Sequence, residues 1–397
     1  MAPTDQEIAL RDRSSRDFFD RSAFHRNRLL RAGFDKHGIR HVEHLRRLPP
    51  FHLDDVSDIT DLLTQPRLNS RDQRQYWPLQ WVMAGDLPLG YSAEDLALLG
   101  ELGRDVLEAA GVRTSDVMAN VLPVAASRDQ LQIQLGAQIG GLSSAVFGIG
   151  ATLDHVLAIS PTVLAGEVKE LNRLLDAAFQ DDRSLLEGIH TFLVTGPAPQ
   201  SRVWKKFQEH VAETTAQVVR AWAPPGVFAM WAQCRGGDAF HTWPNVELLE
   251  VVDPLTGLSV PDGATGTVLW TGVEWYATSV LRLQTDAHVV RVVTPCDTCG
   301  RTSPRLMVEQ KASGFPAVLD AHANVESWFA ELQRSASDDE LVIWLALREP
   351  EHSLEVFADV DAKIGPARVQ VVDVSEIERR LEESNGERFG DRRAMRA

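Results

Sequence analysis

The sequence predicts an α/β protein with a large N-terminal domain and a small α+β C-terminal domain, and three observations support this fold class. Apolar runs of strand length alternate with helical stretches through the first half, as in βαβ units around a mostly parallel sheet. After about Ala223, strands follow one another with turns between them, which indicates a barrel-like antiparallel region. A shorter mixed pattern begins at about Lys311, so we expect domains at residues 1–310 and 311–397.

The N-terminal region is predicted to be helical after a frayed start. The first twenty residues are charged and carry no cap signal. From Asp20 to Arg47 the apolar residues recur at helical spacing around a break at Gly33. We therefore expect ordered helices to begin near residue 20.

Residues 90–112 form the clearest amphipathic helix of the sequence. Ser92 suits the N-cap, and Asp95 stands three residues later at the capping-box position. Gly111 follows the last helical turn and favours its termination. These signals predict a helix with both ends defined.

The parallel region and the remaining elements follow from apolar runs and their spacing. Strands are expected at 120–127, 144–150, 155–160 and 189–196, with helices at 130–142 and 165–179. The strand-rich region is expected at 246–253, 267–272 and 279–285. In the small domain we expect a first helix from 311, strands at 325–334, 341–348 and 367–374, a helix at 352–365, and a charged tail.

Composition excludes several classes of protein. The chain has 397 residues, of which 44% are hydrophobic and 24% are charged, as in ordinary globular proteins. Its net charge of −16 disfavours nucleic acid or an anionic membrane as partner. No apolar stretch approaches the roughly 20 residues of a membrane helix, and no signal peptide is recognised, so a cytoplasmic location is expected. Serine-hydrolase, HExxH and Walker motifs are absent.

The three cysteines of the chain have the spacing of metal ligands. Cys296 and Cys299 form a C-x2-C turn followed by glycine, and Cys234 precedes His241 in a C-x6-H arrangement. Three cysteines and one histidine supply the four soft ligands of a structural zinc site, which leaves no open position for catalysis. A disulfide between Cys296 and Cys299, or three buried free thiols, are the alternatives. A reducing cytosol argues against the disulfide, so we predict zinc within residues 234–299.

Five stretches, taken in order, resemble the phenylacetate–CoA ligase group of the adenylate-forming (AMP-binding) superfamily. They are residues 24–50, 90–112, 246–272, 296–306 and 385–393. Members of that group activate a carboxylate with ATP and then pass the acyl group to a thiol. The resemblance implies the adenylate-forming ligase fold over nearly the whole chain. It also implies a structural metal at Cys234, His241, Cys296 and Cys299.

Two of the group's motifs, one that binds phosphate and one that binds magnesium, are altered in this chain. The hydroxyl-rich phosphate loop corresponds to Trp81–Gly90, which has no hydroxyl side chain and contains Asp86. The tyrosine and the magnesium-binding glutamate of a second stretch correspond to Trp222 and Gly226. Without that carboxylate, magnesium loses its expected protein ligand.

A third element, the ribose-binding aspartate, corresponds to Asp286, in a stretch that is one residue short but retains Arg282 and Thr285. Asp286 is interpreted either as a ribose ligand or as a turn carboxylate at a strand end. No catalytic residue is assigned.

The last two elements concern the small domain. The hinge, which normally carries an arginine and an acidic pair, retains only Glu309 and Lys311. The late lysine that offsets charge on the reacting groups corresponds to Glu387 and Arg388. Arg388 keeps a positive charge, but its planar guanidinium differs from an ammonium.

These substitutions predict a ligase homologue that is impaired or inactive, a pseudoenzyme with structural zinc, for which ATP, magnesium and CoA are doubtful. One alternative is a still-active AMP-forming acid–thiol ligase with a rearranged site that uses Asp286 and Arg388. The other is a non-catalytic protein that binds a small carboxylic acid, the pantetheine arm of a carrier protein, or a partner enzyme. Homo-oligomerisation is left open.

Overall fold

The computed structural model divides the chain into two compact units, residues 1–309 and 310–397. It describes residues 10, 12–39, 41–56, 61–65, 69–84, 87–124, 127–181, 183–196, 202–252, 259–308, 319–320, 322–334, 339–363, 367–384 and 388–391. Within these residues no helix is both long and apolar enough to cross a membrane.

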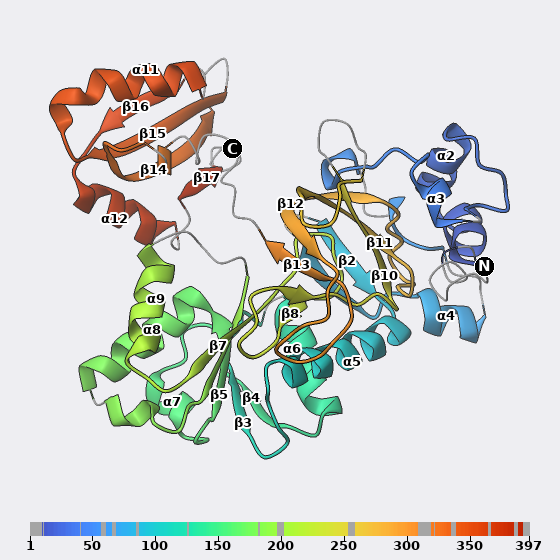
Figure 1. Cartoon of the computed structure of the whole chain (residues 1–397), viewed down its shortest axis with the longest axis horizontal. Helices are drawn as coiled ribbons and strands as arrows, with labels where there is room; N and C mark the ends of the chain where they lie inside the picture. The colour runs from blue at the N-terminus through green and yellow to red at the C-terminus, as the bar shows by residue number, and fades with distance from the viewer. Residues whose placement is uncertain are drawn as a thin grey trace. The chain divides into compact units, whose positions relative to one another are not determined.

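The first unit is built around a long mixed sheet (Figure 1). In the described residues its strand order is β10-β11-β12-β13-β9-β8-β7-β6-β5-β3-β4. The parallel part comprises β3 (Val117–Asn120), β4 (Ser143–Val146), β5 (Val163–Glu167), β6 (Thr191–Thr195) and β7 (Gln217–Trp222). The helices between them are α6 (Arg128–Ile139), α7 (Leu153–Leu157), α8 (Val168–Asp181) and α9 (Arg202–Ala212). The predicted α/β class with a mostly parallel sheet is confirmed for this region.

Several strand and helix predictions in this region were displaced. The strand expected at 120–127 lies earlier, at β3, and most of the described part of 121–127 is loop. The run at 155–160, expected as a strand, contributes to α7, because Thr152 caps that helix by accepting a hydrogen bond from the His155 N–H. The helix expected at 165–179 begins only at Val168, since β5 occupies the residues before it.

The strand-rich part of the sheet is antiparallel, as the sequence predicts. It contains β8 (Trp231–Gln233), β9 (Phe240–His241), β10 (Glu247–Val252), β11 (Thr265–Gly272), β12 (Leu283–Val292) and β13 (Arg305–Val308). The strand β13 pairs with both β12 and β9, so residues distant in sequence become neighbours there. A core of tryptophan and phenylalanine side chains lies within this part, including Phe228, Trp270 and Trp275.

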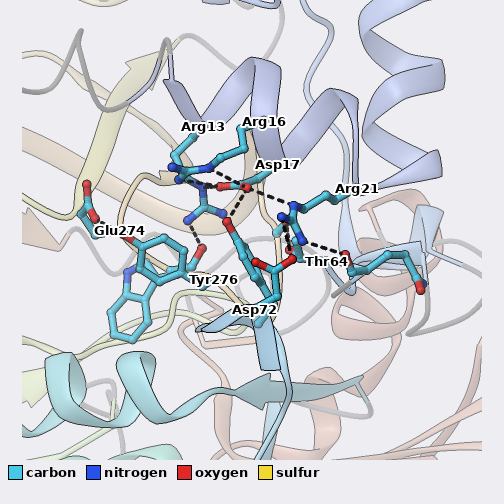
Figure 2. A network of polar contacts seen from close by, with 12 residues as sticks. Arg13, Arg16, Asp17, Arg21, Thr64, Asp72, Glu274 and Tyr276 are labelled. Atoms are coloured by element: carbon cyan, nitrogen blue, oxygen red, sulfur yellow. Dashed lines mark hydrogen bonds and ion pairs between the residues drawn. The ribbon is translucent and has the colours of Figure 1, made fainter. Parts of the chain in front are cut away.

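The N-terminal segment is packed rather than frayed, contrary to the sequence prediction. Of its described residues, Arg13, Asp17 and Phe18 are buried, and a π-helix, η1, spans Ser14–Phe19. Asp17 accepts from Tyr76 (2.8 Å) and lies 2.6 Å from the Arg13 guanidinium, which also donates to the Trp275 carbonyl (Figure 2). Long-range pairing of these charges orders a segment whose local sequence carries no cap.

The helices α2 (Ala23–Arg31), α3 (Val42–Leu45) and α4 (Ser70–Tyr76) follow, and then a hairpin of β1 (Gln80–Ala84) and β2 (Leu87–Tyr91). The hairpin leads into α5 (Ala93–Ala109), where Ser92 and Asp95 form the predicted capping box. Asp95 also accepts from the Tyr276 and Ala277 N–H groups. The start of this helix is therefore fixed to a distant loop of the strand-rich part.

The second unit is a four-stranded sheet with helices, ordered β16-β15-β14-β17 in the described residues. Its elements are β14 (Val325–Arg334), β15 (Asp339–Leu347), α11 (Ser353–Lys363), β16 (Arg368–Val371), α12 (Val374–Glu383) and β17 (Phe389–Asp391). The charged tail expected after residue 374 instead forms α12, because Ile377 is fully buried in a core with Trp344. The helix expected from 311 falls largely outside the described residues.

Candidate metal centre

Two turns carry the four predicted metal ligands. Cys234 directly follows β8, and His241 ends β9, its antiparallel neighbour. Cys296 and Cys299 lie in the connection between β12 and β13. Because β13 pairs with β9, with Arg305 opposite His241, this connection returns to the β8–β9 turn. Sheet topology thus brings together two segments about sixty residues apart.

The ligand atoms of the four residues all lie within 4.8 Å of one another. The Cys234 and Cys296 sulfurs are 3.6 Å apart, and Cys299 Sγ is 3.4 Å from His241 Nε2. A tetrahedral zinc with bonds of about 2.0–2.3 Å holds its ligand atoms roughly 3.4–3.8 Å apart. The 3.6 and 3.4 Å separations match that ion, and the widest separation would have to shorten by about 1 Å on binding. All three cysteines are free thiols, not the disulfide considered from sequence.

Glycines shape both turns around the sulfurs. The Gly237 N–H donates to the Cys234 carbonyl, and a Cβ at this glycine would lie 2.7 Å from Cys234 Sγ. In the second turn the Gly300 N–H donates to the Cys296 carbonyl at 2.8 Å, with a left-handed φ of +71°. A side chain at Gly237 would therefore press on the Cys234 sulfur, whereas at Gly300 only the left-handed backbone disfavours other residues.

The pKa shifts at the cluster favour ligation by His241 and Cys296, whereas that of Cys234 opposes its ionisation in the absence of an ion. Burial, with Arg301 and Arg305 adding to it, lowers the pKa of His241 to about 4, so its imidazole is neutral as a metal ligand must be. Burial raises the pKa of Cys234. Burial also acts to raise the pKa of Cys296, but the N–H groups of Cys299 and Thr298 lower it overall and favour its thiolate.

Asp286, the other large-domain residue assigned by the resemblance, is exposed on β12. Its two companions serve the fold instead. The buried Arg282 forms an ion pair with Glu250 at 2.9 Å, and the Thr285 hydroxyl donates to the Val268 carbonyl. Of the three retained residues, Arg282 and Thr285 are buried and Asp286 is exposed to solvent.

Arg388 lies in the second unit and is half-buried. Its guanidinium is 2.6 Å from Asp320 and lies over the Trp328 ring. The resemblance aligns Arg388 with the lysine that offsets negative charge on the reacting groups. In this structure its positive charge is instead paired with Asp320. Glu309, Lys311 and Glu387 lie outside the described residues.

The Trp222–Gly226 stretch begins at the last residue of β7, and its backbone is closely held. Gly226 has a φ of +83°, and a Cβ there would lie 2.5 Å from the Leu283 side chain. The Arg128 guanidinium donates to the carbonyls of Ala223 (3.1 Å) and Val227 (2.7 Å). Sequence reasoning did not identify Arg128. The sequence offered one clue to its role: Arg128 places a positive charge in the first turn of α6, which the helix dipole disfavours unless a nearby partner compensates.

The phosphate-loop position is a tight hairpin. Ala84 of β1 pairs with Leu87 of β2, so only residues 85 and 86 connect the strands, and these two lie outside the described residues. The stretch that the resemblance aligns with the phosphate loop is therefore strand throughout its described residues.

No protein-family model matches the chain. The chain is 26% identical over 296 residues to a phenylacetate-coenzyme A ligase of Thermus thermophilus, a match that covers 72% of this chain and 65% of that protein, less than two thirds of its length.

Solved structures give a broader match. A 2-hydroxyisobutyryl-CoA ligase in an open conformation, in complex with 2-HIB-AMP and CoA, has a TM-score of 0.69 at 18% identity, covering 93% of this chain and 87% of that one. A benzoate CoA ligase from Burkholderia xenovorans LB400 has a TM-score of 0.50 at 14% identity, covering 78% and 68%. The resemblance to phenylacetate–CoA ligases and the adenylate-forming ligase fold are thereby confirmed.

Proposed function

We propose that this chain, which has the adenylate-forming CoA ligase fold, is a ligase homologue with a lost or greatly weakened ATP-dependent step and a structural zinc. Adenylation requires the triphosphate to be cradled, a metal to bridge its phosphates, and developing charge to be offset. The proposal concerns the residues that would perform these three tasks here.

The observation that carries the proposal is the backbone at Gly226, which the resemblance aligns with the magnesium-binding glutamate. A left-handed φ of +83° strains any other residue, and a Cβ would meet Leu283 at 2.5 Å and Leu53 at 3.2 Å. A carboxylate therefore has no room here unless both leucines repack. Magnesium held on a triphosphate lacks its protein oxygen at this position.

Two further contacts support the proposal. Arg388 is already neutralised by Asp320, at 2.6 Å. The Arg128 guanidinium donates hydrogen bonds to the carbonyls of Ala223, Pro224 and Val227, and these bonds restrain the loop.

Pyrophosphate release tests the catalytic part. The purified chain is incubated with ATP, magnesium and a panel of aryl and aliphatic acids, with an intact phenylacetate–CoA ligase assayed in parallel. We expect no release above the protein-free rate. Robust turnover with any acid would contradict the proposal and favour an active ligase that uses Asp286.

Calorimetry separates the remaining roles. Binding of a small carboxylic acid or of pantetheine without ATP supports a ligand- or carrier-binding protein, whereas ATP binding supports a working ligase. If none of the three binds, a role as partner of another protein is favoured.

The zinc proposal rests on the donor set of Cys234, His241, Cys296 and Cys299. With all four positions filled by protein, the ion would supply no Lewis acid for chemistry and would hold the β8–β9 turn to the β12–β13 connection. Metal analysis should find one zinc per chain. Replacement by cobalt should give the sulfur-to-metal absorption of a tetrahedral thiolate site, reduced in Cys296→Ser. Unchanged melting and no loss of bound zinc in Cys296→Ser would remove the basis for the site.

A further inference from the structure

One face of β1 and the residues before it carries an apolar stripe, defined as Trp77, Leu79, Trp81 and Met83. These side chains are 55%, 63%, 39% and 47% exposed, whereas Val82 between them is 1% exposed. Alternate residues of a strand point to opposite faces, so within β1 Trp81 and Met83 share the outer face while Val82 enters the core. Trp77 and Leu79 are exposed at bends directly before the strand. Monomeric proteins rarely expose large apolar side chains in such a contiguous row.

Charge favours a second copy of the same chain as the partner of this stripe. The chain carries 56 acidic against 40 basic residues, yet the ten residues from Gln75 to Ala84 include none of either. Two copies with a net charge of −16 repel each other least through an uncharged face.

The rim of the stripe is also self-complementary. Arg74, in the last turn of α4, and Glu94, in the first turn of α5, form an exposed ion pair of 2.7 Å. A rim that presents one cation and one anion can pair with itself across a twofold axis, because each charge meets its opposite in the other copy.

The stripe is held rigidly from behind. Tyr76, immediately before it, is buried and donates to Asp17. On the partner strand, the Gly90 N–H donates to the Thr278 hydroxyl at 2.9 Å, and that hydroxyl donates to the Gly90 carbonyl. A face fixed in this way loses little conformational entropy when it is covered.

We propose that the stripe is a homodimer interface, in which the outer face of β1 packs against the same face of a second copy about a twofold axis. Four half-exposed large side chains offer on the order of 400 Å² of apolar surface per copy. Two copies supply about 800 Å² of the roughly 1,200 Å² or more that a specific interface buries. The hairpin backbone and the Arg74–Glu94 rim provide the remainder. This interface goes beyond the proposed function and does not depend on it.

Light scattering coupled to size exclusion tests the proposal on the full-length chain over a range of concentrations. The wild type should have twice the 44.0 kDa mass of one chain. Leu79→Asp should shift the species to a single chain, because a carboxylate at the interface centre would be desolvated without a partner. Its thermal melting as a monomer should stay cooperative, since Leu79 is 63% exposed and makes little of the core. Met83→Lys should act in the same direction with the opposite charge.

Leu30→Asp is the matched control, because Leu30 is 51% exposed in the same unit but outside the stripe. It should leave the dimer intact. A wild type of single-chain mass at every concentration overturns the proposal. A dimer that survives both Leu79→Asp and Met83→Lys also overturns it, since the two copies would then meet through another surface.

Discussion

Glu247 is a carboxylate enclosed by tryptophans in the core of the first unit. Trp231 Nε1 and the Trp243 N–H donate to one of its oxygens, at 2.9 and 2.8 Å, and Trp270 Nε1 donates to the other at 2.6 Å. Burial raises the pKa of Glu247 from 4.5 to about 7, and the three donors only partly oppose this. The folded state therefore holds the proton more tightly than the unfolded chain.

This pKa shift makes stability depend on pH. The stabilisation from protonated Glu247 is complete below about pH 4.5 and is lost as pH rises through 7, on the order of 3 kcal/mol in all. Urea unfolding at pH 5 and pH 8 should show this decline. Glu247→Gln should flatten it while lowering stability, because the amide NH₂ opposes a tryptophan N–H. The exposed Glu101→Gln should leave the slope unchanged, and an unchanged slope in Glu247→Gln would refute the assignment.

Asp17 is the acceptor at the centre of the N-terminal network in Figure 2. Asp17→Asn keeps its shape but leaves the buried Arg13 guanidinium without a counter-charge. We expect a loss of about 3–5 kcal/mol in the free energy of unfolding, measured with urea. Arg16→Gln, at the exposed edge of the same network, should cost less than about 1 kcal/mol. Equal losses for the two variants would show that Asp17 is not the centre.

At the scale of elements, α5 and α6 meet through glycines. A Cβ on Gly103 would lie 2.0 Å from the Gln132 carbonyl oxygen, so the helix axes would have to separate. Gly→Ala within a helix normally gains up to about 1 kcal/mol, but Gly103→Ala should lose about 2 kcal/mol or more. Gly100→Ala on the same helix would meet the end of the half-exposed Ile139 side chain, which can move, and would approach Leu135 Cβ at 3.3 Å, a far milder contact than the one at Gly103. Thermal melting should therefore rank Gly103→Ala well below Gly100→Ala, and the reverse order would exclude this account of the packing.

The elements that were predicted well are those whose signals are local. The capping box of Ser92 and Asp95 defines α5 within a few residues, and the helix is present. The run at 155–160 is short and apolar in either state, so only the Thr152 cap reveals that α7 is a helix. The segment around Arg13 has no local signal, because its order comes from contacts with Tyr76 and Trp275.

The candidate site divides in the same way. Cysteine spacing is a local pattern, and the structure brings all four ligand atoms within 4.8 Å. The steric exclusion at Gly226 depends on Leu283 and Leu53, more than fifty and more than a hundred residues away, so no local pattern contains it. The hydrogen bonds of Arg128 to residues 223–227 are likewise a product of the fold. Sequence similarity indicated which positions differ from the ligases, and only the structure supplies the physical reason.

At the scale of the molecule, the two units have separate cores. The second unit packs Trp328, Ile343 and Val356 on one face of its sheet, with residues of the first unit in other clusters. The four candidate metal ligands all lie in the first unit, within its strand-rich part. Independent cores predict two unfolding transitions, of which only one is coupled to the metal.

Scanning calorimetry of the full chain with and without a chelator tests this coupling. In the proposed site the ion links the two turns in addition to the strand pairing, so on metal removal the transition of residues 1–309 should fall by roughly 5 °C or more. The transition of residues 310–397 should not move. Adding zinc back should restore the first transition, whereas magnesium, which prefers oxygen ligands, should not. If both transitions shift together, the units unfold as one and the metal stabilises the whole chain. If neither shifts although zinc is removed, the four residues do not contribute a stabilising site.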